Sequence, residues 1–129
     1  GNHNNRFKAF ISHCGMFNLE SMYGATEEYF FVNYDLKGPY WDPAAAASYA
    51  ASPHRFVKNW NTPIMIISGG NDFRIPYTES LQAFNAAQLL GVPSKLLIFP
   101  EESHFVLKPQ NSILWQREFF GWLDHYLKN

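Results

Sequence analysis

Two side chains able to do acid–base chemistry each follow a short apolar segment bounded by turn-forming residues. Asp72 comes after the run Ile64–Ile67 and the pair Gly69-Gly70, which allows a sharp turn, and His104 comes after Lys95–Phe99 and a polar loop. Short apolar runs of this kind predict strands buried on both faces of a parallel sheet. Because ligands bind outside the carboxyl ends of such strands, we expect Asp72 and His104 to contribute to one site.

An Asp followed by a His along the chain fits a known catalytic order. A carboxylate can hold one tautomer of an imidazole and stabilise the imidazolium that forms when the ring takes a proton from a nucleophile. Hydrolases of the α/β-hydrolase fold use the chain order Ser, Asp, His. No G-x-S-x-G segment occurs in the 129 residues, so a serine completing such a triad is expected upstream of Gly1.

Composition favours one folded domain and gives no sign of a nucleic-acid or membrane-surface partner. Hydrophobic residues make up 47% of the chain and aromatic residues 18%, which suits a modest core and argues against disorder. The net charge is −1, from 10 basic and 11 acidic residues that form no block of like charge. No apolar run approaches the ~20 residues of a membrane span, and no signal peptide is visible at Gly1. The compartment is left open.

The sequence predicts neither a cofactor nor a metal centre. Cys14 is the only cysteine, so the chain can form no internal disulfide and no zinc cluster of thiolates, and the five histidines lack metal-ligand spacing. Cys14 stands before Gly15 at the end of a predicted strand and could be interpreted as a nucleophile. No base or helix start is evident nearby, and a small packed residue is the favoured interpretation.

The segments that must position Asp72 and His104 alternate between strands and helices. Strands are predicted over residues 7–12, 64–67 and 95–99, and helices over residues 43–51, 79–90 and 111–127. Short helical pieces are predicted over residues 16–32, a loop over 33–41 and a short connector over 56–60. The pattern predicts an α/β fold of about three parallel strands with flanking helices and right-handed crossovers.

Particular residues mark the ends and faces of the predicted helices. Asp42 is a predicted N-cap, with Pro43 at the first helical position. Thr78 is expected to cap the helix over residues 79–90, and Gly91 to end it. The buried face of the last helix is predicted from aromatic residues at helical spacing, which are Trp115, Phe119, Trp122 and Tyr126.

Three segments that cover nearly the whole chain resemble one family. They are RFKAFISHCGMFNLESMYGATEEYFF, SPHRFVKNWNTPIMIISGGNDFRIPYTES and GVPSKLLIFPEESHFV. The D-x-R-I-P motif after one strand and the P-E-x-S-H loop after the next are fairly specific in combination. Together they resemble the C-terminal part of the α/β-hydrolase catalytic domain in the prolyl oligopeptidase family of serine peptidases, which includes dipeptidyl peptidase IV and acylaminoacyl peptidase.

The resemblance implies roles for individual residues. Asp72 would orient the imidazole, and His104 would act as general base and then as general acid. The nucleophile would be the serine of a G-x-S-x-G-G segment upstream of Gly1, and the oxyanion donors would also lie upstream. Phe17 and Tyr23 would form the wall of the pocket for the residue before the scissile bond. Arg74 and Ile75 would make further substrate contacts.

The resemblance also implies what residues 1–129 would lack. The family carries an N-terminal β-propeller that restricts access to short peptides, so this chain would be a C-terminal fragment without the propeller and without the nucleophile-bearing half. One departure from the family concerns the residues before the catalytic His, where many members have glycine and this chain has Glu101, Glu102 and Ser103. The acidic pair could raise the pKa of His104 by its charge, but a solvated pair without effect is favoured.

Three functions are compatible with the sequence. The leading interpretation is the Asp- and His-bearing part of a serine peptidase that cleaves short peptides, inactive alone because it lacks the nucleophile. An esterase or other α/β-hydrolase would share the residue order, and a non-catalytic interaction module would share only the fold. A separation of roughly 2.6–3.2 Å between the Asp72 carboxylate and the His104 ring would favour a catalytic pair.

A sheet of only three strands leaves an unpaired edge and exposed apolar surface. We therefore expect the chain to associate with the missing N-terminal half of the same protein or with another copy of itself. Apart from these, the resemblance implies a peptide substrate as the only partner.

Overall fold

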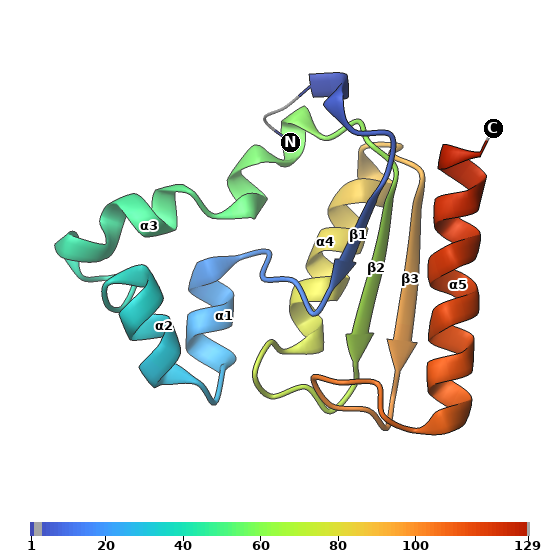
Figure 1. The fold of residues 1–129 in the computed structure, drawn as a ribbon. Helices are drawn as coiled ribbons and strands as arrows, with labels where there is room; N and C mark the ends of the chain where they lie inside the picture. Colours follow the sequence, from blue (N-terminus) through green and yellow to red (C-terminus); the bar gives the residue numbers. More distant parts are fainter. Residues whose placement is uncertain (2–3, 129) are drawn as a thin grey trace.

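Three parallel strands form one open sheet (Figure 1). The computed structural model, which describes residues 1 and 4–128, contains β1 (Phe10–His13), β2 (Ile64–Gly69) and β3 (Ser94–Phe99) in the spatial order β1-β2-β3. This arrangement confirms the predicted α/β fold with three parallel strands. Ile64 lies opposite both Phe10 and Ser94, so the three strands run in register and deliver their carboxyl ends to one edge of the sheet.

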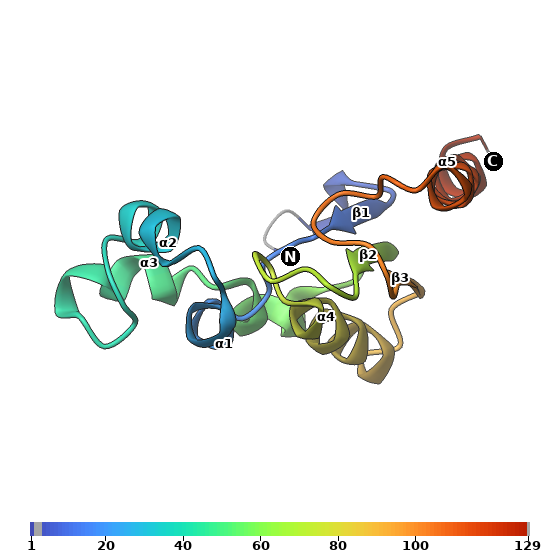
Figure 2. The ribbon, with the colours of Figure 1, turned by 90° about the horizontal axis from the view of Figure 1, so that it is seen from below.

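The central strand β2 is buried because a helix covers each face of the sheet. Side chains of successive strand residues point to opposite faces. Ile66 packs with Ala83 of α4 (Tyr77–Leu89) on one face, and Met65 and Ile67 pack toward α5 (Pro109–Leu127) on the other. Figure 2 shows the two helices on opposite sides of the sheet. Both faces of residues 64–67 therefore favour apolar side chains, which explains the continuous apolar run there.

An irregular helical segment connects β1 to β2 along the chain and lies to one side of the sheet (Figure 1). Its elements are α1 (Leu19–Ala25), α2 (Tyr29–Leu36), α3 (Ala46–Ala50) and two 3₁₀ stretches, η2 (Pro43–Ala45) and η3 (Pro53–Asn59), which precede and follow α3. The segment has its own small core, to which Met22, Val32 and Tyr49 contribute. The prediction of short helical pieces is confirmed, and the helical connector before β2 is confirmed as a 3₁₀ stretch.

The prediction of a loop over residues 33–41 is wrong for residues 33–36, because α2 continues to Leu36. The helix ends where Lys37 adopts a left-handed conformation with a φ of 68° and Gly38 follows with a φ of 127°. Glycine tolerates such angles without steric cost. Asp42 is confirmed as an N-cap, since its Oδ1 accepts a hydrogen bond from the Ala44 N–H at 2.8 Å.

The two long helices begin earlier than predicted. Helix α4 starts at Tyr77 after Pro76 and has no side-chain cap, so the prediction that Thr78 caps it is wrong. Gly91 ends that helix as predicted, with a φ of 69°. Helix α5 starts at Pro109, whose fixed φ and missing N–H suit the first turn.

The aromatic stripe of α5 is only half-buried. Trp115 and Trp122 pack onto the sheet, whereas all four aromatic residues of the stripe keep part of their surface exposed. Within the described residues, β1 pairs on one side only and its other edge has no neighbouring strand. None of the helices that the structure describes is long and apolar enough to cross a membrane.

Candidate active site

Asp72 leaves the end of β2 as a buried carboxylate with partners at both oxygens. Its side chain has no exposed surface. Oδ1 accepts hydrogen bonds from the backbone N–H groups of Arg74 at 3.0 Å and Ile75 at 2.9 Å. Oδ2 lies 2.9 Å from Nδ1 of His104. The loop that follows β2 therefore fixes the carboxylate, and the carboxylate in turn fixes the imidazole.

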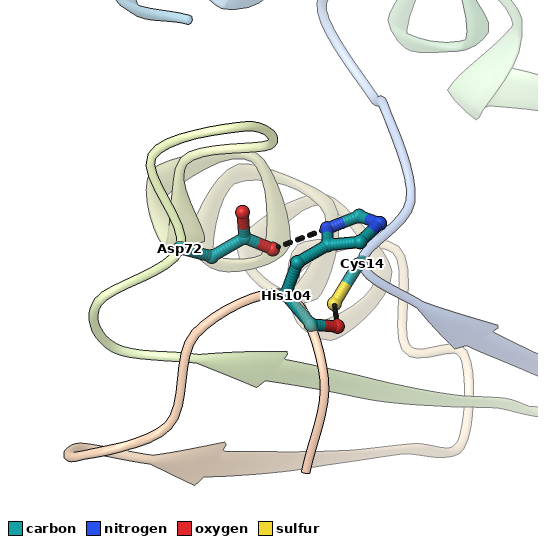
Figure 3. Close-up of side chains that lie close together, drawn as sticks. All are labelled: Cys14, Asp72 and His104. Carbon is teal, nitrogen blue, oxygen red and sulfur yellow. Dashed lines mark hydrogen bonds and ion pairs between the residues drawn. The ribbon is translucent and has the colours of Figure 1, made fainter. Parts of the chain in front are cut away.

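His104 reaches the same edge of the sheet from the end of β3, and its ring faces the Asp72 carboxylate (Figure 3). An ionised carboxylate can only accept hydrogen bonds, so Nδ1 must carry the proton of a neutral ring. This tautomer leaves Nε2 as the basic nitrogen. The His104 side chain is 27% exposed, so the ring can meet a reacting group. The separation of 2.9 Å lies within the range that favours a catalytic pair.

The pair Gly69-Gly70 lets the two loops that carry Asp72 and His104 approach each other closely. A Cβ on Gly69 would lie 2.0 Å from the Ser103 carbonyl oxygen, and one on Gly70 would lie 2.7 Å from the Pro100 carbonyl oxygen. The loops are also hydrogen-bonded, since the Asn71 N–H donates to the Glu102 carbonyl at 2.9 Å. Neither glycine has a positive φ, so close packing of two backbones, rather than a left-handed turn, is what requires them.

Glu102 shapes the loop that presents His104. Its carboxylate is buried and accepts hydrogen bonds from the Leu107 and Lys108 N–H groups and from Asn111 Nδ2. The bond from Asn111 is the largest of the effects that lower the pKa of Glu102. The expectation that both acidic residues before His104 are solvated is therefore wrong for Glu102, whereas the exposed Glu101 pairs with Lys108.

A third buried carboxylate, that of Glu79, ties the segment after β1 to α4. Its Oε2 accepts hydrogen bonds from the N–H groups of Phe17 at 3.1 Å and Asn18 at 2.7 Å. Glu79 lies in the first turn of α4, where the helix dipole favours a negative charge. No sequence pattern marks this residue, because an acidic side chain in the first turn of a helix is usually exposed.

Cys14 lies beside the Asp–His pair, at the point where the chain leaves β1. Its Sγ is 3.4 Å from the His104 carbonyl oxygen. Burial, followed by the neighbouring Asp72, raises the pKa of Cys14 to about 12, so the residue is a thiol at neutral pH. Reactive cysteines have lowered pKa values, and this environment supports the interpretation of Cys14 as a packed residue rather than a nucleophile.

His13 precedes Cys14 and shares its surroundings. Burial lowers the pKa of His13, and the positive charge that His104 can carry lowers it further. The His13 ring packs against Trp115 with 5.8 Å between centroids. A neutral His13 therefore adds no fixed charge to the site at neutral pH.

A largely apolar pocket of about 280 Å³ lies between the helical segment and the loop after Asp72. Arg74 and Ile75 line it, and Arg74 Nε lies 3.0 Å from Glu28 Oε1, which also lines the pocket. The remaining lining residues come from the helical segment and its approach, namely Met16, Met22, Thr26, Phe31, Val32, Asp35 and Leu36. The pocket connects to the Asp–His pair through the two N–H groups that Asp72 binds.

Phe17 and Tyr23 do not line this pocket. Phe17 is buried against Ile66 and Ala83 and borders a separate cavity of about 220 Å³ between the loop after β1 and α4. Tyr23 is buried in the core of the helical segment, where its hydroxyl donates to Asn33 Oδ1 at 3.0 Å. The structure thus brings Arg74 and Ile75 to one pocket and leaves Phe17 and Tyr23 outside its lining.

Comparison with known proteins identifies the family of this chain. The sequence model of the prolyl oligopeptidase family matches residues 1–129. Dipeptidyl-peptidase 5 of Porphyromonas gingivalis is 54% identical over 99% of this chain and 19% of its own length, and that of Schizosaccharomyces pombe is 37% identical over 96% and 18%. The chain therefore spans about a fifth of the length of these relatives.

Solved structures share the fold. An acylaminoacyl peptidase from Pyrococcus horikoshii superimposes with a TM-score of 0.86 at 22% identity, covering 98% of this chain and 21% of its own. A puromycin-hydrolyzing peptidase from Mycobacterium tuberculosis superimposes with a TM-score of 0.83 at 26% identity, covering 94% of this chain and 18% of its own.

Proposed function

The chain belongs to the prolyl oligopeptidase family of serine peptidases, and from this premise we propose that it forms the C-terminal part of the catalytic domain of a longer peptidase, called here the parent protein. The parent would add the nucleophile-bearing half of the domain and a β-propeller. Residues 1–129 would contribute the Asp and the His of a Ser-His-Asp triad, and a peptide would be the substrate.

One observation carries this proposal. Asp72 and His104 leave the carboxyl ends of neighbouring parallel strands, and the buried carboxylate lies 2.9 Å from Nδ1 of the partly exposed ring. This contact keeps the proton on Nδ1 and points the basic Nε2 away from the carboxylate. A pair of ordinary loop residues would need neither a buried carboxylate nor this tautomer, so the geometry favours catalysis over an interaction module.

In the proposed reaction, His104 moves protons while the serine of the parent protein makes and breaks bonds. Nε2 takes the proton of the serine hydroxyl as its oxygen attacks the peptide carbonyl, and Asp72 stabilises the imidazolium that results. The imidazolium then gives its proton to the leaving amine as the C–N bond breaks and an acyl-enzyme remains. Water, deprotonated by the same Nε2, hydrolyses the ester and regenerates the serine.

The pocket beside the Asp72 loop is the proposed site for a substrate side chain. Its lining is mostly apolar, with Arg74 and Ile75 next to the catalytic Asp and the Arg74–Glu28 ion pair as a polar element. Tyr23 would support this wall from the core of the helical segment, whereas Phe17 would border the separate cavity next to α4. Because relatives at 54% and 37% identity are dipeptidyl-peptidases, we propose the removal of dipeptides from peptide amino termini.

The test compares substrates and variants in the parent protein. We expect a peptide substrate with a free amino-terminal dipeptide to be cleaved faster than its N-blocked form and faster than simple esters. Asp72→Asn should lower kcat by a factor on the order of 10³–10⁴, because an Asn NH₂ that donates to Nδ1 leaves the proton on Nε2. Asp124→Asn, which alters an exposed ion pair with Lys128, is the matched control and should leave kcat unchanged.

Two outcomes would contradict the proposal. A loss of less than tenfold in a folded Asp72→Asn protein would remove Asp72 from the mechanism. Turnover of esters without turnover of any peptide would instead indicate an esterase.

A further inference from the structure

Each of the three strands delivers one metal-binding side chain to the same point. Cys14 follows β1, Asp72 follows β2 and His104 follows β3, and one donor atom of each lies within 4.8 Å of the others (Figure 3). The catalytic reaction proposed above uses Asp72 and His104 and leaves the Cys14 thiol without a role. The thiol is nevertheless held in place, with its Sγ 3.4 Å from the His104 carbonyl oxygen.

The three donors match a recognised type of metal site. Thiolate, imidazole and carboxylate are ligands of zinc, and thiolate is preferred by soft divalent ions. Donors at ~2.0–2.3 Å from a tetrahedral ion lie roughly 3.3–3.8 Å apart. Separations of up to 4.8 Å therefore need to close by about 1–1.5 Å, and the 2.9 Å between Asp72 Oδ2 and His104 Nδ1 needs to open by about 0.4 Å. Three protein ligands would leave a fourth position for water.

We propose that Cys14, Asp72 and His104 form an inhibitory site for a thiophilic divalent cation such as Zn²⁺ or Cd²⁺. Binding depends only on this chain's own residues, whereas the inhibition rests on the proposed peptidase function. His104 is partly exposed and gives the ion a route from solvent. The buried Asp72 supplies a negative charge beside the thiol.

Metal binding would remove the catalytic base without any redox step. The ion takes Nδ1 of His104, the atom that faces Asp72, and the proton of Nδ1 moves through solvent to Nε2. The ion also bonds Sγ of Cys14, whose thiol proton is released to solvent, so one proton leaves for each ion bound. The imidazole then carries its proton on Nε2 and cannot accept another from the serine. Asp72 becomes a ligand and no longer orients the ring.

The first experiment measures binding directly, using Cd²⁺ and the parent protein. Titration should produce a thiolate-to-cadmium charge-transfer band that saturates at one equivalent. Cys14→Ser should abolish the band, and His104→Gln should weaken binding at least tenfold. His54→Gln is the matched control, because this histidine is bonded to Ser52 and lies outside the cluster, and it should leave the titration unchanged.

A second measurement needs no variant. X-ray absorption of the Zn²⁺-loaded wild-type protein should show one sulfur at ~2.3 Å together with nitrogen and oxygen ligands. Zn²⁺ should also inhibit peptide cleavage, reversibly on addition of a chelator. The Cys14→Ser protein should need at least tenfold more Zn²⁺ for the same fractional inhibition, with each protein compared with its own metal-free rate.

The outcomes separate this inference from the proposed function. A band that depends on Cys14 and His104 in a protein without peptidase activity would support the metal site and overturn the proposed function. An active peptidase that shows no charge-transfer band, or whose band persists in Cys14→Ser, would overturn the metal site. Zinc bound without a sulfur ligand would overturn it equally, whether or not the variants fold.

Discussion

At the scale of single residues, the Asp72 carboxylate joins catalysis to loop structure. One oxygen accepts hydrogen bonds from two backbone N–H groups of the loop that lines the apolar pocket, and the other oxygen faces His104. The pocket wall and the imidazole are therefore held by the same carboxylate. Sequence alone could predict both residues, because a polar residue just after a buried strand is a local signal.

Other residues of the site have no such local signal. Glu79 is a buried carboxylate whose backbone N–H partners, at Phe17 and Asn18, come near it only once α4 has packed beside the segment after β1. Glu102 is buried because its own loop turns back and brings the Leu107 and Lys108 N–H groups and Asn111 to the carboxylate. Cys14 could be placed at a strand end but not beside His104, since that distance depends on the register of three strands. Burial of a charged residue is a tertiary property, and residue type usually predicts the opposite.

The role of Glu102 leads to a prediction about pH. Its pKa is lowered in the folded chain, so the carboxylate stabilises the fold above about pH 4.5, and this contribution is lost as pH falls through the lowered pKa. We expect Glu102→Gln to lower the melting temperature of the parent protein at pH 7 by a few degrees. The difference from wild type should shrink below pH 4.5, which thermal unfolding across a pH series would measure.

Glu101→Gln serves as the control for this series. Glu101 is exposed and pairs with Lys108 at the surface, where ion pairs contribute little to stability. The melting temperature of the Glu101→Gln protein should stay close to that of wild type at pH 7. A Glu102→Gln protein as stable as the Glu101→Gln protein at pH 7 would show that the buried carboxylate does not support the His104 loop.

At the scale of elements, the site is a junction of two loops that touch through their backbones. The strands that carry these loops were predictable because a strand buried on both faces of a sheet has a continuous run of apolar residues. The extension of α2 over residues 33–36 was not, because the apolar side chains of this helix are spread around it: Val32 is buried, whereas Phe30 and Phe31 are exposed. Its end depends on left-handed angles at Lys37 and Gly38 that no periodicity encodes.

The contact between the loops predicts a strong effect of Gly69→Ala. The new Cβ would meet backbone oxygens of Ser103 and Glu102 at 2.0 and 2.4 Å, and backbone cannot move aside as a side chain can. We expect a loss of about 3 kcal/mol in the stability of the catalytic domain, at the upper end of what overpacking usually costs. Urea unfolding of the parent protein would measure this loss, and kcat should fall as the loops separate.

Gly121→Ala is the matched control for this substitution. Gly121 lies within α5, and a Cβ there would meet no atom within 4 Å. Alanine in a helix is favoured over glycine by roughly 0.5–1 kcal/mol, so this variant should be as stable as wild type or slightly more stable. Equal unfolding curves for the two glycine variants would contradict the proposed role of Gly69.

At the scale of the whole molecule, several surfaces are suited to further protein. The outer edge of β1 pairs with no strand within the described residues, and the aromatic stripe of α5 is only half covered. Phe30 and Tyr34 of α2 are each 80% exposed. These features favour association with the rest of the parent protein, and they fit a chain that spans about a fifth of its relatives' length. The proposed nucleophile lies upstream of residue 1, because the sequence contains no G-x-S-x-G segment.

The most direct measurement of the triad is therefore covalent labelling of the parent protein with a fluorophosphonate, followed by peptide mapping. We predict one labelled serine upstream of residue 1, and we predict that His104→Ala abolishes the labelling because Nε2 no longer activates the hydroxyl. The His54→Gln protein should label as wild type does. A folded parent protein that takes no label, or that labels equally well without His104, would contradict the assignment of Asp72 and His104 to a working triad.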